Sequence, residues 1–346
     1  MLIVGICLAL CFPAHPQQAP LQPVNSSAAP AIAAGVGADG IRTEEAVVVT
    51  GDQPGPGLWL VRKGGHDLWI LGTLSPLPAK MQWRATQVEV VIANAQEVLY
   101  PPSLTIGSDI NKFRALLLLP SLVGVRNNPD GKKLKDVLPA NTYVRWEAYR
   151  DRFLPGDRDV DKMRPVFAAQ QLWKAAIKRS GLDGKDPVKP IVSAAIERHH
   201  PSVTVVKQTI NIKDPKAAIK QFKSSQFEDI ACMERTLDRL GEDMQAMRNR
   251  ANAWAMGDIP ALRAVSLSDQ YQVCMEAVTE SGMGRKLGMG DVSQRLETEW
   301  VAKAETALLH NATTFATLPM RDMLKPGGYA DQLRAKGYAV LAPDDD

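Results

Sequence analysis

The chain has 346 residues, enough for one large domain or two small ones with a sizeable core. Hydrophobic residues make up 45% of the chain and charged residues 23%, as in an ordinary soluble globular protein. A formal net charge of +3, without a long basic run, gives no overall reason to expect binding to nucleic acid or to an anionic membrane.

Residues 1–25 have the character of a secretory signal. Met1–Pro13 is an apolar stretch of the length found in signal peptides, and it is too short to span a bilayer. No Lys or Arg precedes Arg42, so the positively charged start of a signal peptide is missing, as expected if the true start lies upstream. Leu8–Cys11 occupies the place of a lipoprotein cleavage box, but the bulky Leu10 argues against lipidation.

Residues 26–55 are rich in Ala, Pro, Gly and Ser, which predicts a disordered linker. The folded domain is predicted to cover residues 56–343. A leader, a linker and a folded domain in this order predict an exported protein, periplasmic or secreted, whose mature domain has no transmembrane helix.

Cys232 and Cys274 lie in two successive helical patterns. In an exported domain, two such cysteines most simply form a disulfide that links the helices. The alternative is a pair of buried free thiols.

A β-hairpin is predicted to open the domain. The apolar runs Leu58–Val61 and Leu68–Leu71 flank a turn, Lys63–Asp67, in which Gly-Gly supplies the positive φ angles of a tight turn. The second strand continues into Gly72 and Thr73, and a helix pattern opens after them. The end of such a strand is a usual place for the functional site of an α/β protein.

The middle of the chain predicts a helix over Trp83–Ala95, a strand over Glu97–Tyr100 and a second strand over Val203–Ile212. Between these strands, apolar periodicity predicts helices over Asp109–Leu119, Tyr143–Arg152, Arg164–Ser180 and Ile191–His199.

The C-terminal part predicts long helices over Pro215–Lys223, Phe227–Gly257, Ile259–Leu267, Ser268–Gly282 and Asp291–His310. Gly257 is expected to end one helix in a left-handed conformation, and Asp258 to cap the next. A strand over Thr313–Leu318, a short helix over Gly327–Lys336 and a strand over Gly337–Leu341 follow. The predicted fold is therefore mixed α/β (α+β), with a central sheet that begins in the hairpin and a large helical layer that covers it.

Three segments carry a resemblance to a known family. Leu58–Tyr100 (hairpin, Gly-Thr, helix and short strand), Ala253–Asp258 (Ala-Trp-x-x-Gly-Asp) and Leu333–Val340 (Leu-Arg-x-x-Gly-Tyr-x-Val) resemble the TraB/GumN family. This family is similar to, or includes, metal-dependent hydrolases such as the Tiki-type peptidases. The resemblance implies a Gly-Thr-x-His motif, a Glu at the end of the next strand, and a second Gly-x-x-His near the C-terminus.

The chain departs from this pattern at each ligand position. Ser75 stands where the first His belongs, Tyr100 where the Glu belongs, and Pro319 or Asp322 where the second His belongs. Gly72 and Thr73 are retained. The segments Ile70–Pro76 and Thr314–Met320 resemble each other, which supports a two-lobed site, and the family resemblance implies that the two corners meet. The vestigial site predicted from the resemblance comprises Gly72, Thr73, Ser75, Tyr100, Pro319 and Asp322.

No other pattern in the chain predicts a metal site. Zinc and manganese require several His, Asp, Glu or Cys ligands that converge on one point. The histidines (His15, His66, His199, His200 and His310) have no metal-binding spacing. Ser75 also lacks the Gly-x-Ser-x-Gly context of a nucleophile. No cofactor is therefore expected.

The first hypothesis is an exported, non-catalytic pseudo-hydrolase of the TraB/GumN type. It would bind a peptide, a glycan or an envelope protein through the vestigial cleft, and no nucleic acid. The alternative is an active metal-dependent peptidase of this family that uses other ligands with manganese, cobalt or zinc. A third hypothesis is a structural envelope protein without a ligand.

Overall fold

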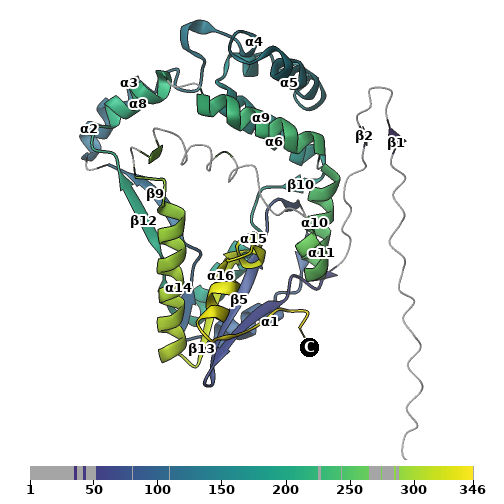
Figure 1. The fold of residues 1–346 in the computed structure, drawn as a ribbon, viewed down its shortest axis with the longest axis vertical. Helices are drawn as coiled ribbons and strands as arrows, with labels where there is room; N and C mark the ends of the chain where they lie inside the picture. The colour runs from purple at the N-terminus through teal and green to yellow at the C-terminus, as the bar shows by residue number, and fades with distance from the viewer. Residues whose placement is uncertain are drawn as a thin grey trace, which may run out of the picture. The chain divides into compact units, whose positions relative to one another are not determined.

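The computed structural model describes residues 35–36, 42–43, 52–79, 81–108, 110–224, 227–242, 244–264, 274, 284–285 and 288–345. The chain divides into two compact units, Met1–Thr43 and Glu44–Asp346. In the first unit, the described residues form one antiparallel pair, β1 (Gly35–Val36) with β2 (Arg42–Thr43). The predicted leader and most of the predicted linker lie outside the described residues. All other described elements belong to the second unit (Figure 1).

The predicted hairpin is confirmed. β4 (Leu58–Lys63) and β5 (His66–Thr73) pair in antiparallel fashion as far as Lys63 and His66. Gly64 and Gly65 form the two-residue turn with φ angles of 61° and 85°. Positive φ at both central positions matches the twist of the flanking strands, and glycine adopts it without steric cost.

The hairpin is part of a six-stranded mixed sheet in the order β11-β8-β13-β5-β4-β14. Its other strands are β8 (Glu97–Leu99), β11 (Ser202–Thr204), β13 (Thr313–Pro319) and β14 (Ala339–Leu341). Strands β5, β13, β8 and β11 run parallel to one another, while β4 is antiparallel to both of its neighbours. The central mixed sheet of the prediction is therefore present.

Helices cover the middle of the sheet on both faces. The five successive residues of β13 from Thr314 to Leu318 are all buried, which requires neighbours on either side of the strand. α1 (Thr86–Asn94) packs against β13 and α7 (Val188–His199). α14 (Val292–His310) packs against β5 and β13, and α16 (Tyr329–Ala335) packs against α14 and β14.

Other helices build a second apolar core of their own, where the sequence predicted a single helical layer over the sheet. This core is formed by α4 (Leu134–Val137), α5 (Ala140–Phe153), α6 (Pro165–Arg179) and α9 (Phe227–Glu242). Trp146, Leu172 and Met233 are fully buried in it. Two short 3₁₀ helices, η1 (Pro129–Gly131) and η2 (Asp159–Lys162), complete this region. α10 (Met244–Met256) and α11 (Ile259–Ala264) instead contribute Trp254 and Ile259 to the core of the sheet.

Several predicted boundaries were wrong. The strand predicted over Val203–Ile212 is divided into β11 and β12 (Lys207–Asn211), and β12 pairs with β9 (Ser103–Gly107) in a separate parallel ribbon. The helix predicted from Trp83 begins at Thr86, because Trp83 belongs to β7 (Gln82–Trp83), which pairs with β3 (Asp52–Gln53). Short apolar strands and helix starts look alike in sequence, so tertiary pairing decides between them.

The predicted helices were also subdivided. Asp109–Leu119 becomes α2 (Lys112–Leu117) and α3 (Leu119–Leu122), and Phe227–Gly257 becomes α9 and α10. α8 (Pro215–Ser224) agrees with its prediction, and two short strands, β6 (Leu77–Pro78) and β10 (Leu182–Asp183), form an additional pair. Apart from Cys274, the predicted helix over Ser268–Gly282 lies outside the described residues.

The predicted turn between α10 and α11 is confirmed. Gly257 has a φ of +72°, and a Cβ there would lie 2.9 Å from the carbonyl oxygen of Gly55. Asp258 caps α11, because its Oδ1 accepts a hydrogen bond of 2.9 Å from the backbone N–H of Ala261. Both residues are therefore required by the local backbone.

The predicted disulfide between Cys232 and Cys274 is present and closes a sequence separation of 42 residues. Cys232 is buried in the helical core beside Met233.

Replacing both cysteines with Ser is expected to lower the free energy of unfolding by about 2–4 kcal/mol, because the unfolded chain gains the freedom that the loop closure removes. Urea denaturation of the oxidised protein and of the double variant measures this difference. Adding a reductant to the wild type should reproduce the loss, and equal midpoints for all three samples would contradict the expectation.

Within the described residues, no helix combines the length and the apolar character needed to cross a bilayer.

Candidate functional site

The ends of the parallel strands bring the two predicted corners together. Parallel strands place their carboxyl ends at the same edge of a sheet. Thr73, at the end of β5, is paired in register with Pro319, at the end of β13. β8 ends at Leu99, which is level with Ala316 of β13. Tyr100 follows Leu99 and therefore lies two positions short of the level of Pro319. We call this edge, with Thr73, Ser75, Tyr100 and Pro319, the strand-end site.

Gly72 allows close packing under the strand-end site. A Cβ at this position would lie 2.8 Å from Sδ of Met320 and would also overlap its Cε. Met320 is the first residue of α15 (Met320–Leu324) and is fully buried. The carbonyl oxygen of Gly72 accepts a hydrogen bond of 2.7 Å from Nε1 of Trp254. The glycine of the Gly-Thr pair is therefore explained by the packing of α15 and α10.

The two hydroxyl groups of this corner donate to backbone carbonyl groups. Oγ1 of Thr73 donates to the carbonyl oxygen of Leu318 at 3.4 Å. Oγ of the exposed Ser75 donates to the carbonyl oxygen of Gly184 at 3.3 Å, and the peptide bond from Ser75 to Pro76 is cis. Within the described residues, no hydrogen bond joins Ser75 to a histidine, so the corner lacks the base that activates a serine nucleophile.

Tyr100 is held at the strand-end site by its backbone. Its N–H donates to the carbonyl oxygen of Thr204 at 3.0 Å, and its carbonyl oxygen accepts from Nε1 of Trp300 at 3.0 Å. The indole of Trp300 is fully buried and meets the ring of Tyr329 edge to face, with 4.9 Å between the centroids. The aromatic pair of Trp300 on α14 and Tyr329 on α16 thus packs beneath the end of β8, where Trp300 holds the backbone of Tyr100.

A polar cluster on α14, α15 and α16 contains Asp322. Asp322 pairs with Arg321 at 3.1 Å, and Glu297 pairs with Lys325 at 2.9 Å. Glu297 also accepts a hydrogen bond of 2.7 Å from Nε2 of Gln332. The sequence interpretation missed Glu297, although its spacing of three residues from Trp300 places both on one face of a helix.

The same cluster perturbs Tyr329. Burial of the phenol raises the pKa of Tyr329 above its ordinary value, and the nearby carboxylates of Asp322 and Glu297 raise it further. Tyr329 is only 4% exposed, so its hydroxyl group stays protonated near neutral pH.

The residues of the strand-end site do not fit a zinc or manganese ion. Within the described ranges, no three His, Cys, Asp or Glu side chains gather closely enough to hold a metal. Glu97 is half-buried, and its carboxylate accepts hydrogen bonds from Oγ1 of Thr204 at 2.5 Å and from Nδ2 of Asn311 at 2.8 Å. The Asp322 carboxylate is paired with Arg321. Hydroxyl groups and paired carboxylates are a poor donor set for these metals.

The histidines among the described residues lie elsewhere, and His15 is outside the described ranges. Nδ1 of His66, at the start of β5, is 2.8 Å from the carbonyl oxygen of Asn311, and Nδ1 of His310 is 2.8 Å from that of Thr306. His199 ends α7, and His200 follows it in the left-handed conformation. The structure does not bring these side chains to the strand-end site.

The fold and the strand-end site define a mixed α/β domain whose candidate site lies at the carboxyl ends of parallel strands. The sequence model of the TraB/PrgY/gumN family matches residues 57–342, and the chain belongs to this family. The resemblance derived from the hairpin, the Trp-x-x-Gly-Asp turn and the C-terminal strand is thereby confirmed. Neither a curated protein nor a solved structure gives a significant match to the chain.

Proposed function

We propose that this TraB/PrgY/gumN family member is an exported, non-catalytic binding protein of the cell envelope. The observation that carries this proposal is the pairing of Thr73 with Pro319 at the strand-end site. The two corners meet, but the places of the family's imidazoles are taken by the hydroxyl group of Ser75, which donates to the carbonyl oxygen of Gly184, and by Pro319 or the ion-paired Asp322.

The physical reason is that metal-dependent hydrolysis depends on complete ligation. A divalent ion activates water only when several ligands hold it in a fixed geometry, and the loss of supporting groups weakens both affinity and activity. The resemblance implies that Ser75, Tyr100 and either Pro319 or Asp322 replace three ligands at once. The scaffold is therefore suited to hold a ligand without cleaving it.

Export is supported by two independent features. Met1–Pro13 is apolar and is followed by a linker-like segment, as in a secretory signal. The disulfide between Cys232 and Cys274 fits an oxidising compartment, such as the periplasm or the extracellular space.

The catalytic part of the proposal is tested by metal analysis and an activity assay on one preparation. The purified protein is expected to contain no stoichiometric metal and to leave peptide substrates intact with added Mn²⁺, Co²⁺ or Zn²⁺. Stoichiometric metal together with peptide hydrolysis that a chelator abolishes would establish the alternative, an active peptidase that uses other ligands.

The binding part is tested with arrays of peptides and of envelope glycans. We expect a ligand whose binding is lost in Ser75→Arg, because the long cation would fill the exposed corner beside Thr73. Leu309→Arg is the matched control, since Leu309 is exposed on α14 and makes no part of the strand-end site. Equal binding by both variants would exclude the strand-end site as the place of recognition.

A further inference from the structure

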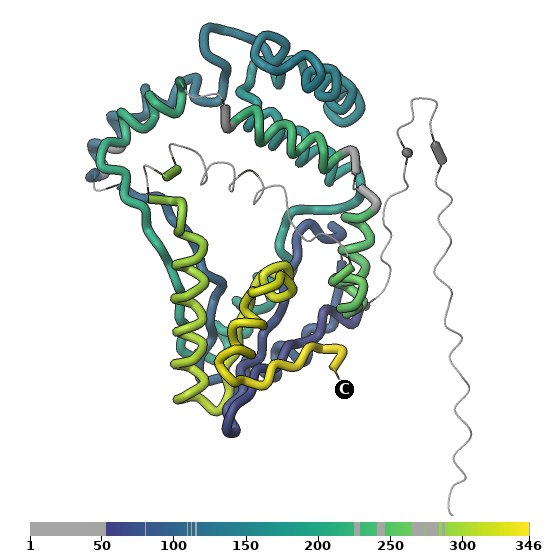
Figure 2. Tube along the Cα trace, viewed as in Figure 1, coloured from purple at the N-terminus to yellow at the C-terminus, as the bar shows by residue number. Residues whose placement is uncertain are grey.

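A basic arm extends from the edge of the sheet. Beyond β8 and β11, the chain continues as β9 and β12, which pair in parallel from Ser103 with Lys207 to Gly107 with Asn211. α2 and α3 follow β9 and α8 follows β12, so the three helices lie together at the end of this ribbon (Figures 1 and 2). Nζ of Lys223 on α8 donates to the carbonyl oxygen of Val123 at 2.8 Å. We define the basic arm as residues 101–128 and 205–224.

The basic arm exposes a dense group of large apolar side chains. Seven of the fourteen exposed large apolar side chains among the described residues fall between residues 106 and 123. They are 43–75% exposed and comprise Ile106, Phe113, Leu116, Leu117, Leu119, Leu122 and Val123. Such clusters on a protein surface mark interaction sites.

The short helices of the arm gain little from internal burial. α2 has six residues and α3 has four, and isolated helices of this length are unstable in water. Neither α3 nor α8 has a fully buried residue. The exposed apolar side chains of α2 and α3 therefore remain available for burial against a partner.

The arm also concentrates positive charge. Its two segments contain eight Lys and Arg against two Asp, a net charge of +6, while the whole chain carries only +3. The eight cationic residues are Lys112, Arg114, Arg126, Lys207, Lys213, Lys216, Lys220 and Lys223. In the part of the chain that the structure describes, Lys213, Lys216 and Lys220 are exposed and have no carboxylate partner. The charge complements an anionic surface.

We propose that the basic arm docks on an anionic lipid surface. The apolar side chains of α2 and α3 enter the interface between headgroups and acyl chains, and the lysines of α8 contact the anionic headgroups. A bilayer accepts protruding leucines without shape complementarity, whereas a protein partner would require a matching groove. The combination of exposed Leu and Phe with adjacent Lys is typical of helices that lie in this interface.

The proposal is tested by sedimentation of the full chain with vesicles of phosphatidylcholine, with or without about 30% phosphatidylglycerol as the source of anionic charge. We expect binding to the anionic vesicles, reduced about fivefold by each of Lys216→Gln and Lys220→Gln. The double variant Leu116→Ser with Leu117→Ser is expected to bind at least about tenfold more weakly, because it removes two inserted side chains.

Matched controls are available on α14. Leu309→Ser changes a leucine that is 69% exposed, and Lys303→Gln an exposed lysine, both outside the basic arm. These controls should bind vesicles as the wild type does. All variants share the leader, so any contribution of the apolar N-terminus cancels. Unfolding midpoints of the variants, compared with that of the wild type, establish that they fold.

Three outcomes would overturn the proposal. The first is the absence of binding to anionic vesicles, and the second is an equal loss of binding in the α14 controls. The third is a dimer without vesicle binding that the Leu116 and Leu117 double variant dissociates, since this would assign the arm to a second copy of the chain. The basic arm contains none of the residues of the strand-end site, although both belong to the same domain. The vesicle experiment can therefore fail or succeed independently of the hydrolysis and array experiments.

Discussion

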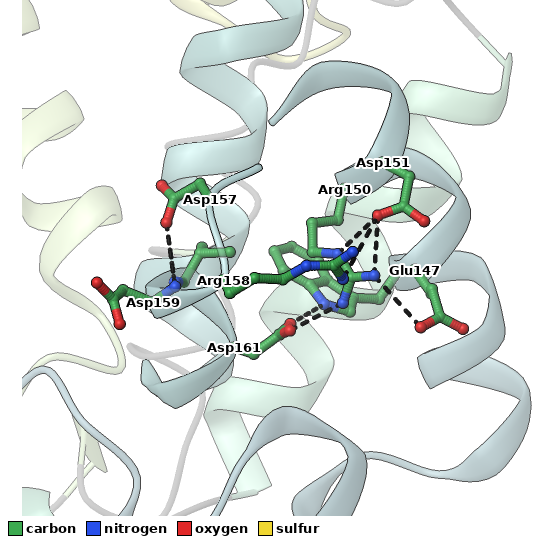
Figure 3. A network of polar contacts seen from close by, with 9 residues as sticks. Glu147, Arg150, Asp151, Asp157, Arg158, Asp159 and Asp161 are labelled. Carbon is green, nitrogen blue, oxygen red and sulfur yellow. Dashed lines mark hydrogen bonds and ion pairs between the residues drawn. The ribbon is translucent and has the colours of Figure 1, made fainter. Parts of the chain in front are cut away.

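Replacement of Asp161 with Ala is expected to lower the free energy of unfolding by about 3–5 kcal/mol, because it breaks the buried ion pair between Asp161 and Arg150. Asp161 is 9% exposed and accepts hydrogen bonds from Nε1 of Trp146 at 2.9 Å and from a terminal nitrogen of Arg150 at 2.8 Å (Figure 3). Arg150 is 2% exposed. The variant thus removes the acceptor of two buried donors in the helical core.

The charge of Arg150 persists because of its partners. Burial by itself lowers the pKa of the Arg150 guanidinium, but hydrogen bonds to Asp151 and Asp161 outweigh burial and raise the pKa above its ordinary value. Arg150 therefore stays charged in the Asp161→Ala variant, where it keeps only its contacts with Asp151 and Glu147, whose carboxylates are about half exposed to water.

Two further variants make this prediction specific. Asp151→Ala removes a carboxylate that is 57% exposed, and because water screens it, its pair with Arg150 is expected to contribute at most about 1 kcal/mol. Asp161→Asn keeps an acceptor for Trp146, so its loss of unfolding free energy should lie between those of Asp161→Ala and Asp151→Ala. Urea unfolding at neutral pH measures all three, and a loss in Asp161→Ala no larger than that in Asp151→Ala would refute the assignment.

Replacement of Trp300 with Ala is expected to destabilise the protein by about 3–5 kcal/mol through the cavity that it leaves. The indole is fully buried between α14 and the end of β8, where its Nε1 donates to the carbonyl oxygen of Tyr100 at 3.0 Å. The ring of Tyr329 also loses its edge-to-face contact with the indole. The variant should therefore loosen the strand-end site in addition to lowering stability.

Trp300→Phe separates packing from hydrogen bonding. It keeps an aromatic ring but removes the donor to Tyr100, so a loss of about 1–3 kcal/mol is expected from the unpaired carbonyl. Thermal or urea unfolding of the two variants gives the comparison. Equal losses in Trp300→Phe and Trp300→Ala would mean that the hydrogen bond, and not the volume of the ring, determines the effect.

Local sequence patterns correctly predicted those elements whose backbone geometry is fixed by a few neighbouring residues. Gly64 and Gly65 dictate the hairpin because both positions need positive φ. Gly257 and Asp258 dictate the end of one helix and the cap of the next. The absence of imidazoles at Ser75 and Pro319 is likewise a property of the sequence alone.

Other features depended on partners that are distant in the chain. The division of Val203–Ile212 into β11 and β12 follows from pairing with β8 and β9, about which the local alternation carries no information. The role of Gly72 also required the structure, since only the packing of Met320 and Trp254 explains it. The separate helical core arose in the same way, from contacts between α6 and α9.

By itself, the sequence determined the family, the hairpin and the turn at Gly257, because each of these depends on residue types within a short window. Only the tertiary structure decided which distant segments meet. It paired Thr73 with Pro319 and joined residues 101–128 with residues 205–224 into one basic arm. Pairing of β9 with β12 brings together two cationic segments that are separated in the sequence by residues 129–204. A chain of small net charge can therefore carry a locally cationic surface.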